Sequence, residues 1–130
     1  MAAYPESHQD LLDQPGFAVF TAVTPKGQLQ STVVWYLLDD DGKLKITSTG
    51  ARKKVRNLEA DPRVTMLFMD ADNPYRTLEV RGTASVALDD DLVLQKKIGV
   101  KYDHDAVSHD PPGTVRYTIT IEPETVNTFG

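Results

Sequence analysis

Hydrophobic and polar residues alternate with a period of two along much of this chain, which is the pattern of strands that bury one face. Strands are predicted over residues 17–23, 43–48, 76–86 and 115–122. Gly82 interrupts the third of these alternations, which predicts a bend or bulge such as a barrel needs. Pro123 is expected to end the last strand, because proline cannot donate to the hydrogen-bond ladder of a sheet.

Two further predicted strands, residues 29–38 and 64–69, contain runs that are apolar on both faces. Such a strand is covered on both faces, and in a small antiparallel protein the second cover is often another subunit. Trp35 and Tyr36 lie in the first of these runs. We expect them in the core or in a subunit interface. The alternative is that they form one wall of an aromatic pocket.

Three short helices are predicted between these strands. They cover residues 7–12, 51–60 and 89–100. In the second helix, Val55 and Leu58 share one face, and Asp61-Pro62 ends it. Hairpin turns join the strands more often than helices do. The pattern therefore predicts a mainly β fold with short helices, a single domain over residues 1–130 built as an antiparallel six-stranded barrel.

Composition and charge narrow the function classes. The 130 residues are enough for one hydrophobic core, and the chain carries 14 Lys and Arg against 19 Asp and Glu. A net charge of −5 argues against general binding to nucleic acid or to an anionic membrane. No apolar run approaches a membrane span, and we read no secretory signal, so the expected compartment is the cytoplasm. Without cysteine, the chain has no disulfide, thiolate nucleophile, cysteine-ligated zinc or iron–sulfur cluster.

Against this acidic background, one stretch concentrates positive charge directly after the third strand. Its hydroxyl and basic members are Thr47, Ser48, Thr49, Arg52, Lys53, Lys54 and Arg56. The start of a helix offers free backbone N–H groups and a dipole that favours an anion. Cations at that end oppose the dipole, so their placement favours an anion site over a solvated helix face. We therefore predict that the stretch binds phosphate or a comparable oxyanion.

Helix geometry divides this basic cluster. Arg52 and Arg56 share a face and Lys53 lies beside it, whereas Lys54 points elsewhere and would have to bend toward a ligand at the helix start. Asn57 is a candidate to orient members of the cluster. The basic side chains are therefore expected to be split between the anion and solvent.

Familiar nucleotide and hydrolase motifs do not occur in the sequence. It has neither the P-loop G-x-x-x-x-G-K-[ST] nor G-x-G-x-x-G after a strand, which excludes P-loop NTPases and the usual dinucleotide-binding fold. It also has no serine-hydrolase elbow, HExxH or paired-carboxylate signature. His104, Asp105, His109 and Asp110 lie in a polar loop without helical spacing or a third cluster, so we predict no metal site.

A second constellation, Asp72-Asn73-Pro74-Tyr75-Arg76, stands where a hairpin turn is expected. Asn-Pro is a common turn signal, and taken alone the stretch is best explained as a plain turn. Tyr75 and Arg76, just past the turn, could instead stack on a planar ligand or hydrogen-bond to it.

The order of these sequence segments along the chain identifies a protein family more specifically than any single segment does. A Pro-Lys-Gly turn from residue 25, the Val33-Val34-Trp35-Tyr36 strand, an acidic hairpin and a strand ending in Thr-Ser-Thr are followed by ARKKVRNLEADPRV from residue 51 and DNPYRTLEVRG from residue 72. This combination resembles the pyridoxamine 5′-phosphate oxidase-like superfamily, and most closely its branch of small reductases that use the deazaflavin coenzyme F420. The resemblance covers residues 15–86, with a weaker final strand.

The resemblance implies an FMN-binding type of split β-barrel that works as a homodimer, with two cofactor sites at the subunit interface. A partner subunit would then supply the second cover of the doubly apolar strands. The cofactor phosphate would lie against Thr47, Ser48, Thr49, Arg52, Lys53 and Lys54, with Arg56 and Asn57 close behind. The ring system would lie near Asn73, Pro74, Tyr75 and Arg76 and near the strand over residues 30–34.

The activity implied is hydride transfer from the reduced deazaflavin to an electron-poor double bond in a planar small molecule. Because the cofactor carries the hard step, the protein needs no nucleophile, and a substrate proton could come from Tyr75, Tyr36 or solvent. The alternatives are an FMN-binding oxidoreductase of the same superfamily and a non-enzymatic barrel dimer that stores or carries a flavin or haem. The wealth of Arg and Lys favours F420, whose tail carries a phosphate and several carboxylates.

Overall fold

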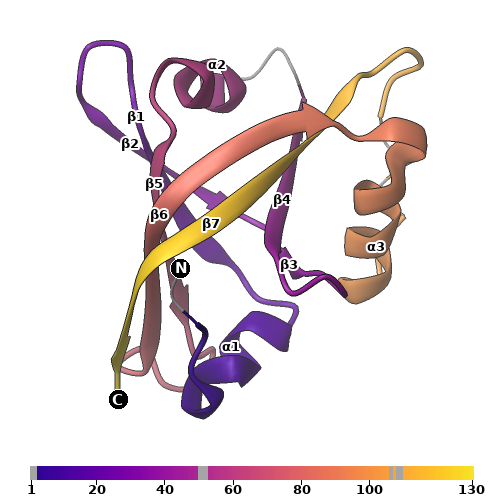
Figure 1. Cartoon of the computed structure of the whole chain (residues 1–130). Helices are drawn as coiled ribbons and strands as arrows, with labels where there is room; N and C mark the ends of the chain where they lie inside the picture. The colour runs from indigo at the N-terminus through magenta and orange to yellow at the C-terminus, as the bar shows by residue number, and fades with distance from the viewer. Residues whose placement is uncertain (1–2, 50–52, 106, 108–109) are drawn as a thin grey trace.

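The computed structural model describes residues 3–49, 53–105, 107 and 110–130, and these form one antiparallel sheet with short helices around it (Figure 1). The strands are β1 (Ala18–Val23), β2 (Leu29–Val34), β3 (Leu37–Leu38), β4 (Leu44–Thr49), β5 (Arg63–Met69), β6 (Thr77–Leu88) and β7 (Arg116–Phe129). The helices are α1 (Gln9–Asp13), α2 (Lys53–Ala60) and α3 (Val93–Lys101), with short 3-10 helices at Glu6–His8 and Asp90–Leu92. The predicted mainly β class is confirmed. None of the described helices is long and apolar enough to span a membrane.

The sheet is curled, and its strand order, β2-β1-β5-β6-β7-β4-β3, requires this. β2 and β3 are the two outer strands, yet only Trp35 and Tyr36 separate them along the chain. Three residue steps reach about 11 Å at most, whereas the strands of a flat sheet lie roughly 4.8 Å apart. The two edges of this seven-stranded sheet must therefore come round toward each other, as they do in a split barrel.

The strand count differs from the prediction, because the described residues form seven strands instead of six. The predicted strand over residues 29–38 divides at Trp35 and Tyr36. Its first part pairs with β1 and its second part pairs with β4. Both parts pack on the same core, so the apolar pattern continues through the point where the pairing partner changes.

β6 and β7 pair with each other around an irregularity at Gly82. The register shifts between Arg81 and Gly82, which confirms the predicted bulge. A Cβ at Gly82 would clash with the carbonyl oxygen of Glu122, so the close approach of the two backbones requires glycine. The prediction that Pro123 ends the last strand is wrong, because Pro123 lies at this irregularity, where its missing N–H is tolerated, and β7 continues to Phe129.

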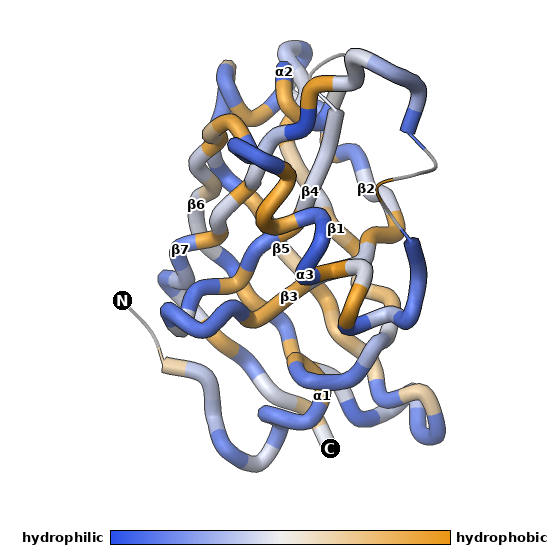
Figure 2. The backbone as a smooth tube through the Cα atoms, turned by 90° about the vertical axis from the view of Figure 1, so that its right-hand side faces the viewer, coloured by the Kyte–Doolittle hydropathy of each residue, from blue (hydrophilic) through white to orange (hydrophobic). Residues whose placement is uncertain are grey.

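The core lies inside the curl, and the connecting loops are mostly hydrophilic (Figure 2). α1 covers one end of the barrel with Leu11 and Leu12, both fully buried. α2 covers the other end with Val55 and Leu58, which share the buried face predicted for that helix. Tyr36 is fully buried as well, and its hydroxyl donates to the carbonyl oxygen of Leu11 at 2.7 Å, so it is a core residue.

Apolar side chains also lie on the outer face of the sheet. Val33, Val19 and Leu67 stand in one row across β2, β1 and β5, and Met69 lies further along β5. These four residues form the Val33 patch, whose exposed fractions run from 38% at Val19 to 65% at Val33. The chain itself thus leaves part of the doubly apolar strands uncovered, and the cover by a second subunit stays a prediction.

Candidate functional site

The barrel is split between β2 and β4. β4 pairs with β3 only at Leu44 and Lys45, and β1 is the one sheet neighbour of β2 among the described residues. The free edge of β2 and the remainder of β4 therefore border an opening, with α2 across one end of it (Figure 1). Two adjoining cavities occupy this opening.

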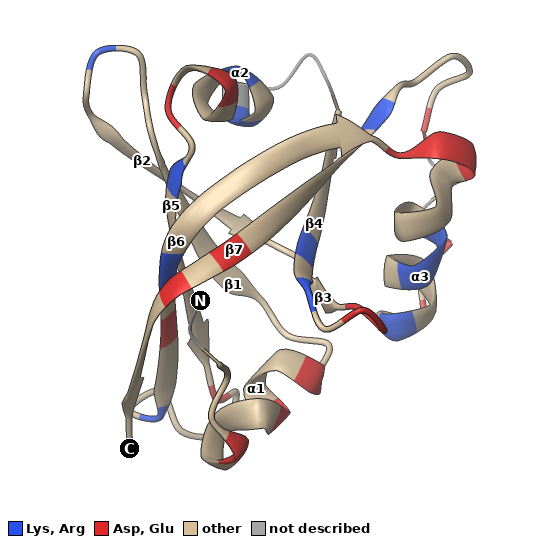
Figure 3. Cartoon of the chain, in the orientation of Figure 1, with Lys and Arg blue, Asp and Glu red and all other residues tan. Residues whose placement is uncertain are grey.

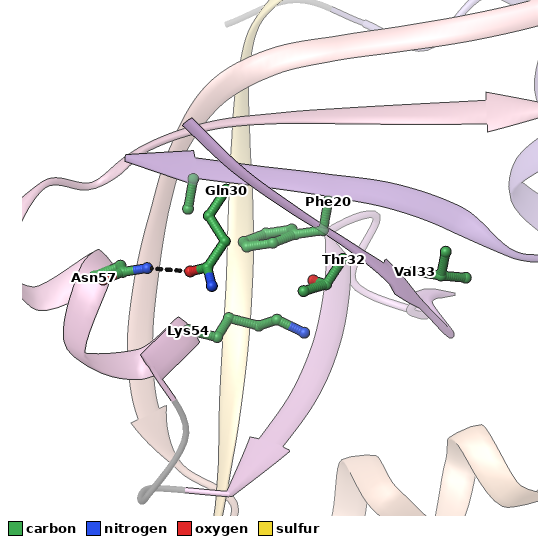
Figure 4. A pocket seen from close by; sticks show the side chains of 7 residues that line it. Phe20, Gln30, Thr32, Val33, Lys54 and Asn57 are labelled. Carbon is green, nitrogen blue, oxygen red and sulfur yellow. Dashed lines mark hydrogen bonds between the residues drawn. The ribbon is translucent and has the colours of Figure 1, made fainter. Parts of the chain in front are cut away.

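The Phe20 cavity has a volume of about 450 Å³ and lies between β1, β2 and α2 (Figure 4). Its lining residues are Phe20, Ala22, Gln30, Thr32, Val33, Lys54 and Asn57. Lys54 extends into it from α2, with Nζ 5.5 Å from the centre of the Phe20 ring. Asn57 is buried, and its Nδ2 donates to Gln30 Oε1 at 2.8 Å. This hydrogen bond fastens α2 to β2.

The Trp35 cavity has a volume of about 310 Å³ and lies between the ends of β2 and β4 and the α3 side of the barrel. Lys54 and Val33 line it too, so the two cavities adjoin at these residues. Its other lining residues are Val34, Trp35, Thr47, Ser48, Thr49, Gln95, Ile98, His104, Asp110 and Arg116. An elongated ligand could therefore pass Lys54 and contact both cavities.

Three hydroxyl residues at the end of β4 form one wall of the Trp35 cavity. Ser48 is buried, whereas Thr47 and Thr49 are half-buried, because alternate residues of a strand point to opposite faces. The Oγ1 of Thr47 is nevertheless buried and has no hydrogen-bond partner in the described part of the chain. Since buried hydroxyls in folded proteins are nearly always satisfied, this oxygen marks a polar group that a ligand or an ordered water would complete.

Another wall of the Trp35 cavity is aromatic. Trp35 stacks on Tyr102 with ring centres 4.4 Å apart and planes 11° apart, and His104 meets Trp35 edge-on at 5.4 Å. The Tyr102 hydroxyl donates to the carbonyl oxygen of Gly16 at 2.7 Å and accepts from the backbone N–H of Tyr36 at 3.1 Å. Burial raises the pKa of Tyr102, so it stays a neutral hydrogen-bonding group. Trp35 is thus the wall of a pocket, whereas Tyr36 is core.

An ion pair also lines the Trp35 cavity. Arg116 Nε and Nη2 donate to the two oxygens of Asp110 at 2.9 and 2.7 Å, and Gln95 Nε2 donates to the same carboxylate at 2.9 Å. Gln95 lies on α3, whose first turn is fixed by Asp89. The Asp89 carboxylate accepts from the backbone N–H groups of Leu94 and Gln95, both at 3.0 Å. The guanidinium and carboxylate offset each other, so the pair adds little net charge to the cavity.

Lys101 supports the aromatic wall from behind. Its Nζ donates to the carbonyl oxygens of Tyr36 at 2.8 Å and Leu12 at 3.0 Å, and it lies 4.0 Å from the centre of the Tyr36 ring. Burial lowers the pKa of Lys101 to about 8. The lysine thereby joins α3 to α1 and to the chain between β2 and β3.

The structure brings together part of the predicted phosphate site. Thr47, Ser48, Thr49 and Lys54 line the Trp35 cavity, and Asn57 lines the adjoining Phe20 cavity. The expectation that Lys54 points away from the site is wrong, because it is the basic residue that lines both cavities. The side chain reaches them from beside the buried face of α2, as Figure 4 shows.

The rest of the basic cluster is placed differently. Arg56 is exposed and lines a third cavity of about 380 Å³ at the β1–β2 turn, together with Lys26 and Asn57. Arg52 lies outside the described residues. Lys53 is the first residue of α2 that the structure describes, and its part in the site stays a prediction.

The turn containing Asn73, Pro74, Tyr75 and Arg76 lies at the far end of β5 from α2 (Figure 1). Val33, which lines both cavities, is level with Leu67 near this end of β5, but β1 lies between their two strands. Tyr75 is 77% exposed. None of these four residues lines the Phe20 cavity or the Trp35 cavity, and their contact with a cofactor ring through a second copy of the chain stays a prediction.

Arg76 instead has partners beside α1, where acidic residues gather (Figure 3). Its two terminal nitrogens donate to Asp10 at 2.7 and 2.8 Å, to Asp70 at 3.1 Å and to the carbonyl oxygen of Ser7 at 2.6 Å. These bonds hold the pKa of Asp10 below its usual range. Arg76 therefore anchors α1 to the β5–β6 turn.

Sequence reasoning missed several residues of the Trp35 cavity. Gln95, Asp110 and Arg116 come from a helix, a loop and a strand start, and no periodicity links them. A signal was present in the loop around His104, but it was interpreted only as a weak metal motif. Among the described residues, no group of three or more His, Asp or Glu side chains could hold a metal ion.

Comparison with known proteins agrees with this architecture. A family model described as pyridoxamine 5′-phosphate oxidase matches residues 4–128. A solved structure named F420 reductase is 33% identical, covers 95% of this chain and 98% of its own, and superposes with a TM-score of 0.84. No curated protein matches the chain.

More distant structures share the fold. A conserved hypothetical protein from Mycobacterium tuberculosis is 20% identical, with 98% of this chain and 85% of that chain covered and a TM-score of 0.76. A heme storage protein from Vibrio cholerae is 15% identical, with 99% of this chain and 96% of that chain covered and a TM-score of 0.70. These two likenesses concern architecture alone.

Proposed function

The chain belongs to the pyridoxamine 5′-phosphate oxidase family, and on that premise we propose that it is an oxidoreductase that uses coenzyme F420. It would transfer a hydride between the deazaflavin and an unsaturated small molecule. One observation carries the proposal: Lys54 and the hydroxyl residues Ser48 and Thr49 line one cavity in the split of the barrel. The 33% identity to an F420 reductase over 95% of this chain supports that cofactor.

The residues around Lys54 fit a phosphate group. An ammonium group and hydroxyls are the donors that phosphate oxygens accept from, and the start of a helix such as α2 adds backbone N–H groups and a favourable dipole. The buried Oγ1 of Thr47 is a further polar atom that a bound cofactor would satisfy. In this proposal the phosphate lies at Lys54, and the ring lies along β2.

The reduced cofactor, when bound, supplies the hydride. The chain binds and orients it: Lys54 offsets the phosphate charge, and the hydrogen bond between Asn57 and Gln30 holds α2 against β2. Tyr36 is not a proton donor, because its hydroxyl is buried and bonded to the core. The proton that accompanies the hydride therefore comes from solvent or from Tyr75 of a second copy.

A homodimer is part of the proposal. The Val33 patch borders the Phe20 cavity, since Val33 belongs to both, and covering exposed apolar side chains stabilises an interface. A second copy seated there would also bring residues 73–76 toward the ring. Light scattering should give the mass of a dimer for the wild type and of a monomer for Leu67→Glu, which places a charge in the patch. A monomeric wild type would contradict the dimer.

Fluorescence titration with F420 tests the phosphate site. Lys54→Ala should weaken binding by about 1–3 kcal/mol, or roughly fivefold to 150-fold, because a charge-assisted contact is lost. Lys43→Ala, which removes an exposed lysine beside the β3–β4 turn, is the matched control and should bind as the wild type does. Equal affinity of all three proteins would overturn the assignment.

FMN is the second candidate cofactor, because its phosphate would meet the same donors. A protein that is yellow as purified and absorbs at about 450 nm would favour FMN. A colourless protein that binds added F420 would favour the first proposal. Turnover of reduced F420 with quinones, enones and tetrapyrroles then separates an enzyme from a carrier. A protein that binds the cofactor and reduces no acceptor would be a carrier.

A further inference from the structure

We propose that α3 is a lid on the Trp35 cavity, hinged at its two ends and clasped to the rest of the chain by Lys101 and Tyr102. The use of this lid to admit a ligand rests on the proposed function, whereas its motion belongs to the chain alone. Gln95 and Ile98 of α3 line the cavity, so a movement of the helix changes access to it. Three features support the lid: strained ends, packing outside the main core and a polar clasp.

The two ends of α3 hold strained backbone. Within the part of the chain that the structure describes, the non-glycine residues with positive φ are Asp91 at 58°, Leu92 at 56° and Asp103 at 50°. The first two directly precede α3, and the third follows its last residue by two positions. The left-handed conformation is unfavourable for residues that carry a Cβ, and hinges are residues at the ends of elements that absorb changes in φ and ψ. A turn of α3 that returned these residues to negative φ would release the strain.

The apolar side chains of α3 pack outside the main core. Leu94 and Ile98 are buried, yet neither belongs to the cluster of core residues inside the curl of the sheet. In Figure 1 the helix stands beside β3 and β4, outside that curl. Because these side chains are not part of the core cluster, α3 can move without unpacking it.

A polar clasp holds the end of the helix in place. Tyr36 lies between β2 and β3; its backbone N–H donates to the Tyr102 hydroxyl at 3.1 Å, and its carbonyl oxygen accepts from Lys101 Nζ at 2.8 Å. The same two side chains donate to the carbonyl oxygens of Gly16 at 2.7 Å and Leu12 at 3.0 Å. Because water can satisfy each of these groups when the helix moves away, the clasp can be released at a modest cost.

The charge of Lys101 gives the lid a pH dependence. Burial lowers the pKa of Lys101 to about 8, so its charged form is favoured where the side chain is exposed to water. Protonation therefore favours the open lid, and deprotonation above pH 8 favours the closed lid. Asp13 at the end of α1 opposes this effect in part, because its carboxylate stabilises the charged lysine in the closed lid.

Other titratable groups lie on the elements around this clasp. They are Tyr36, Asp39, Lys97, Tyr102 and His104. Burial raises the pKa of both tyrosines, so they stay protonated at pH 9.5. Lys97 and Asp39 form an ion pair with each other at 2.8 Å, which raises the pKa of the lysine and lowers that of the carboxyl. His104 meets Trp35 edge-on, so the pH series below is measured in proteins that carry His104→Gln.

Acrylamide quenching tests the pH dependence in the free protein. Trp35 is the single tryptophan of the chain and lines the cavity, so quenching of its fluorescence measures access to the cavity. The quenching constant should fall about twofold to fivefold between pH 7 and pH 9.5 as the lid closes. Lys101→Arg, which stays charged throughout this range, should show no such fall. A constant that does not change with pH, or that falls equally in Lys101→Arg, would overturn the lid.

Hinge variants test the lid at constant pH. Asp90 and Asp91 are adjacent and exposed, and of the two only Asp91 has positive φ. Asp91→Val disfavours the left-handed backbone of the closed lid, so the Tyr36 amide should exchange its hydrogen about fivefold to twentyfold faster. Asp91→Gly removes the strain and should slow this exchange about twofold. Asp90→Val, the matched control, should exchange as the wild type does. Residue-resolved NMR measures these rates.

Amides of the β5–β6 ladder are the internal reference, because a general loss of stability would accelerate their exchange as well. If Asp90→Val and Asp91→Val accelerate the Tyr36 amide equally, or if the ladder amides accelerate in step with it, α3 is not a hinged lid. These experiments need no cofactor, so a protein that shows the expected exchange and quenching but binds neither F420 nor FMN would keep the lid and reject the proposed function.

Discussion

Two regions of this protein carry a basic residue close to polar residues in the sequence, and the structure gives the two basic side chains different surroundings. At the cavity end, Lys54 extends from α2 and lines two adjoining cavities. At the turn end, Arg76 donates to Asp10, Asp70 and the carbonyl oxygen of Ser7. The sequence identifies both cations but not the groups that they face.

The comparison shows that the surroundings of a basic side chain decide whether it is a candidate to contact a ligand. Arg76 lies where α1 approaches the sheet, so carboxylates of its own chain surround it. Lys54 lies where the sheet is split, so it faces a cavity. Four changes test this difference between the cavity end and the turn end.

The largest expected effect is that of Lys54→Glu. Reversing the charge at the shared wall of the two cavities should weaken F420 binding by roughly a hundredfold or more, because a carboxylate repels the phosphate. The melting temperature should stay near that of the wild type, since the residue is only half-buried. Fluorescence titration and calorimetry measure the two quantities. If this variant binds F420 as tightly as the wild type does, Lys54 does not contact the cofactor and the proposed difference from Arg76 is contradicted.

Asn57→Leu should affect stability and binding together. It leaves the half-buried Gln30 amide without its partner and releases α2 from β2, which should cost about 1–3 kcal/mol of unfolding free energy. F420 affinity should fall a few-fold, because Lys54 is carried by the same helix. Urea denaturation measures the stability, with Glu59→Leu on the exposed face of α2 as the control. If both variants are equally stable, the hydrogen bond does not hold the helix in place.

Lys101 connects the two ends, and its effect should depend on pH. Its pKa is about 8 in the folded chain against 10.5 for an ordinary lysine, so the unfolded chain binds more protons between these values. The unfolding free energy should therefore rise with pH across that window, by about 1–2 kcal/mol after allowance for solvent screening. Below pH 8, Lys101 is protonated in both the folded and the unfolded chain, so the cost of burying its charge is fully present. Lys101→Met should lack this rise, and parallel pH profiles of the two proteins would contradict the prediction.

The smallest expected effect is that of Arg76→Met. Its partner Asp10 is well exposed, and exposed ion pairs contribute little, so the melting temperature should fall by a few degrees at neutral pH. The pKa of Asp10 is lowered by Arg76, so the lost stability is present above the ordinary carboxyl pKa and disappears as pH falls through the lowered value. Calorimetry of both proteins at neutral and acid pH measures this. A difference that persists in acid would show that the ion pair is not its cause.

Much of the fold follows from residue patterns. Period-two alternation predicted most of the strands, Val55 and Leu58 predicted the buried face of α2, and Gly82 predicted the bulge. The errors arose where pairing partners change. The run from β2 to β3 is uniformly apolar while it passes from one sheet edge to the other, and Pro123 is tolerated because a bulge lies beside it.

The candidate site was predicted only in part, because only some of its residues are close to one another in the sequence. Thr47, Ser48, Thr49 and Lys54 are close in sequence, and their type and spacing beside a helix start indicated an anion site. Their opposite wall is assembled from Trp35, α3 and the start of β7, which are distant in sequence and have no shared motif.

The sequence by itself determined the mainly β class and the bulge, and it predicted an anion site at residues 47–58, because these depend on local pattern and charge. Only the tertiary structure decided that Lys54 lines the two cavities and that Arg76 donates to Asp10, Asp70 and the carbonyl oxygen of Ser7. It also decided that Trp35 is the wall of a cavity whereas its neighbour Tyr36 is core. The physical reason is the curl of the sheet, which brings the edges of β2 and β4 to face each other across the split.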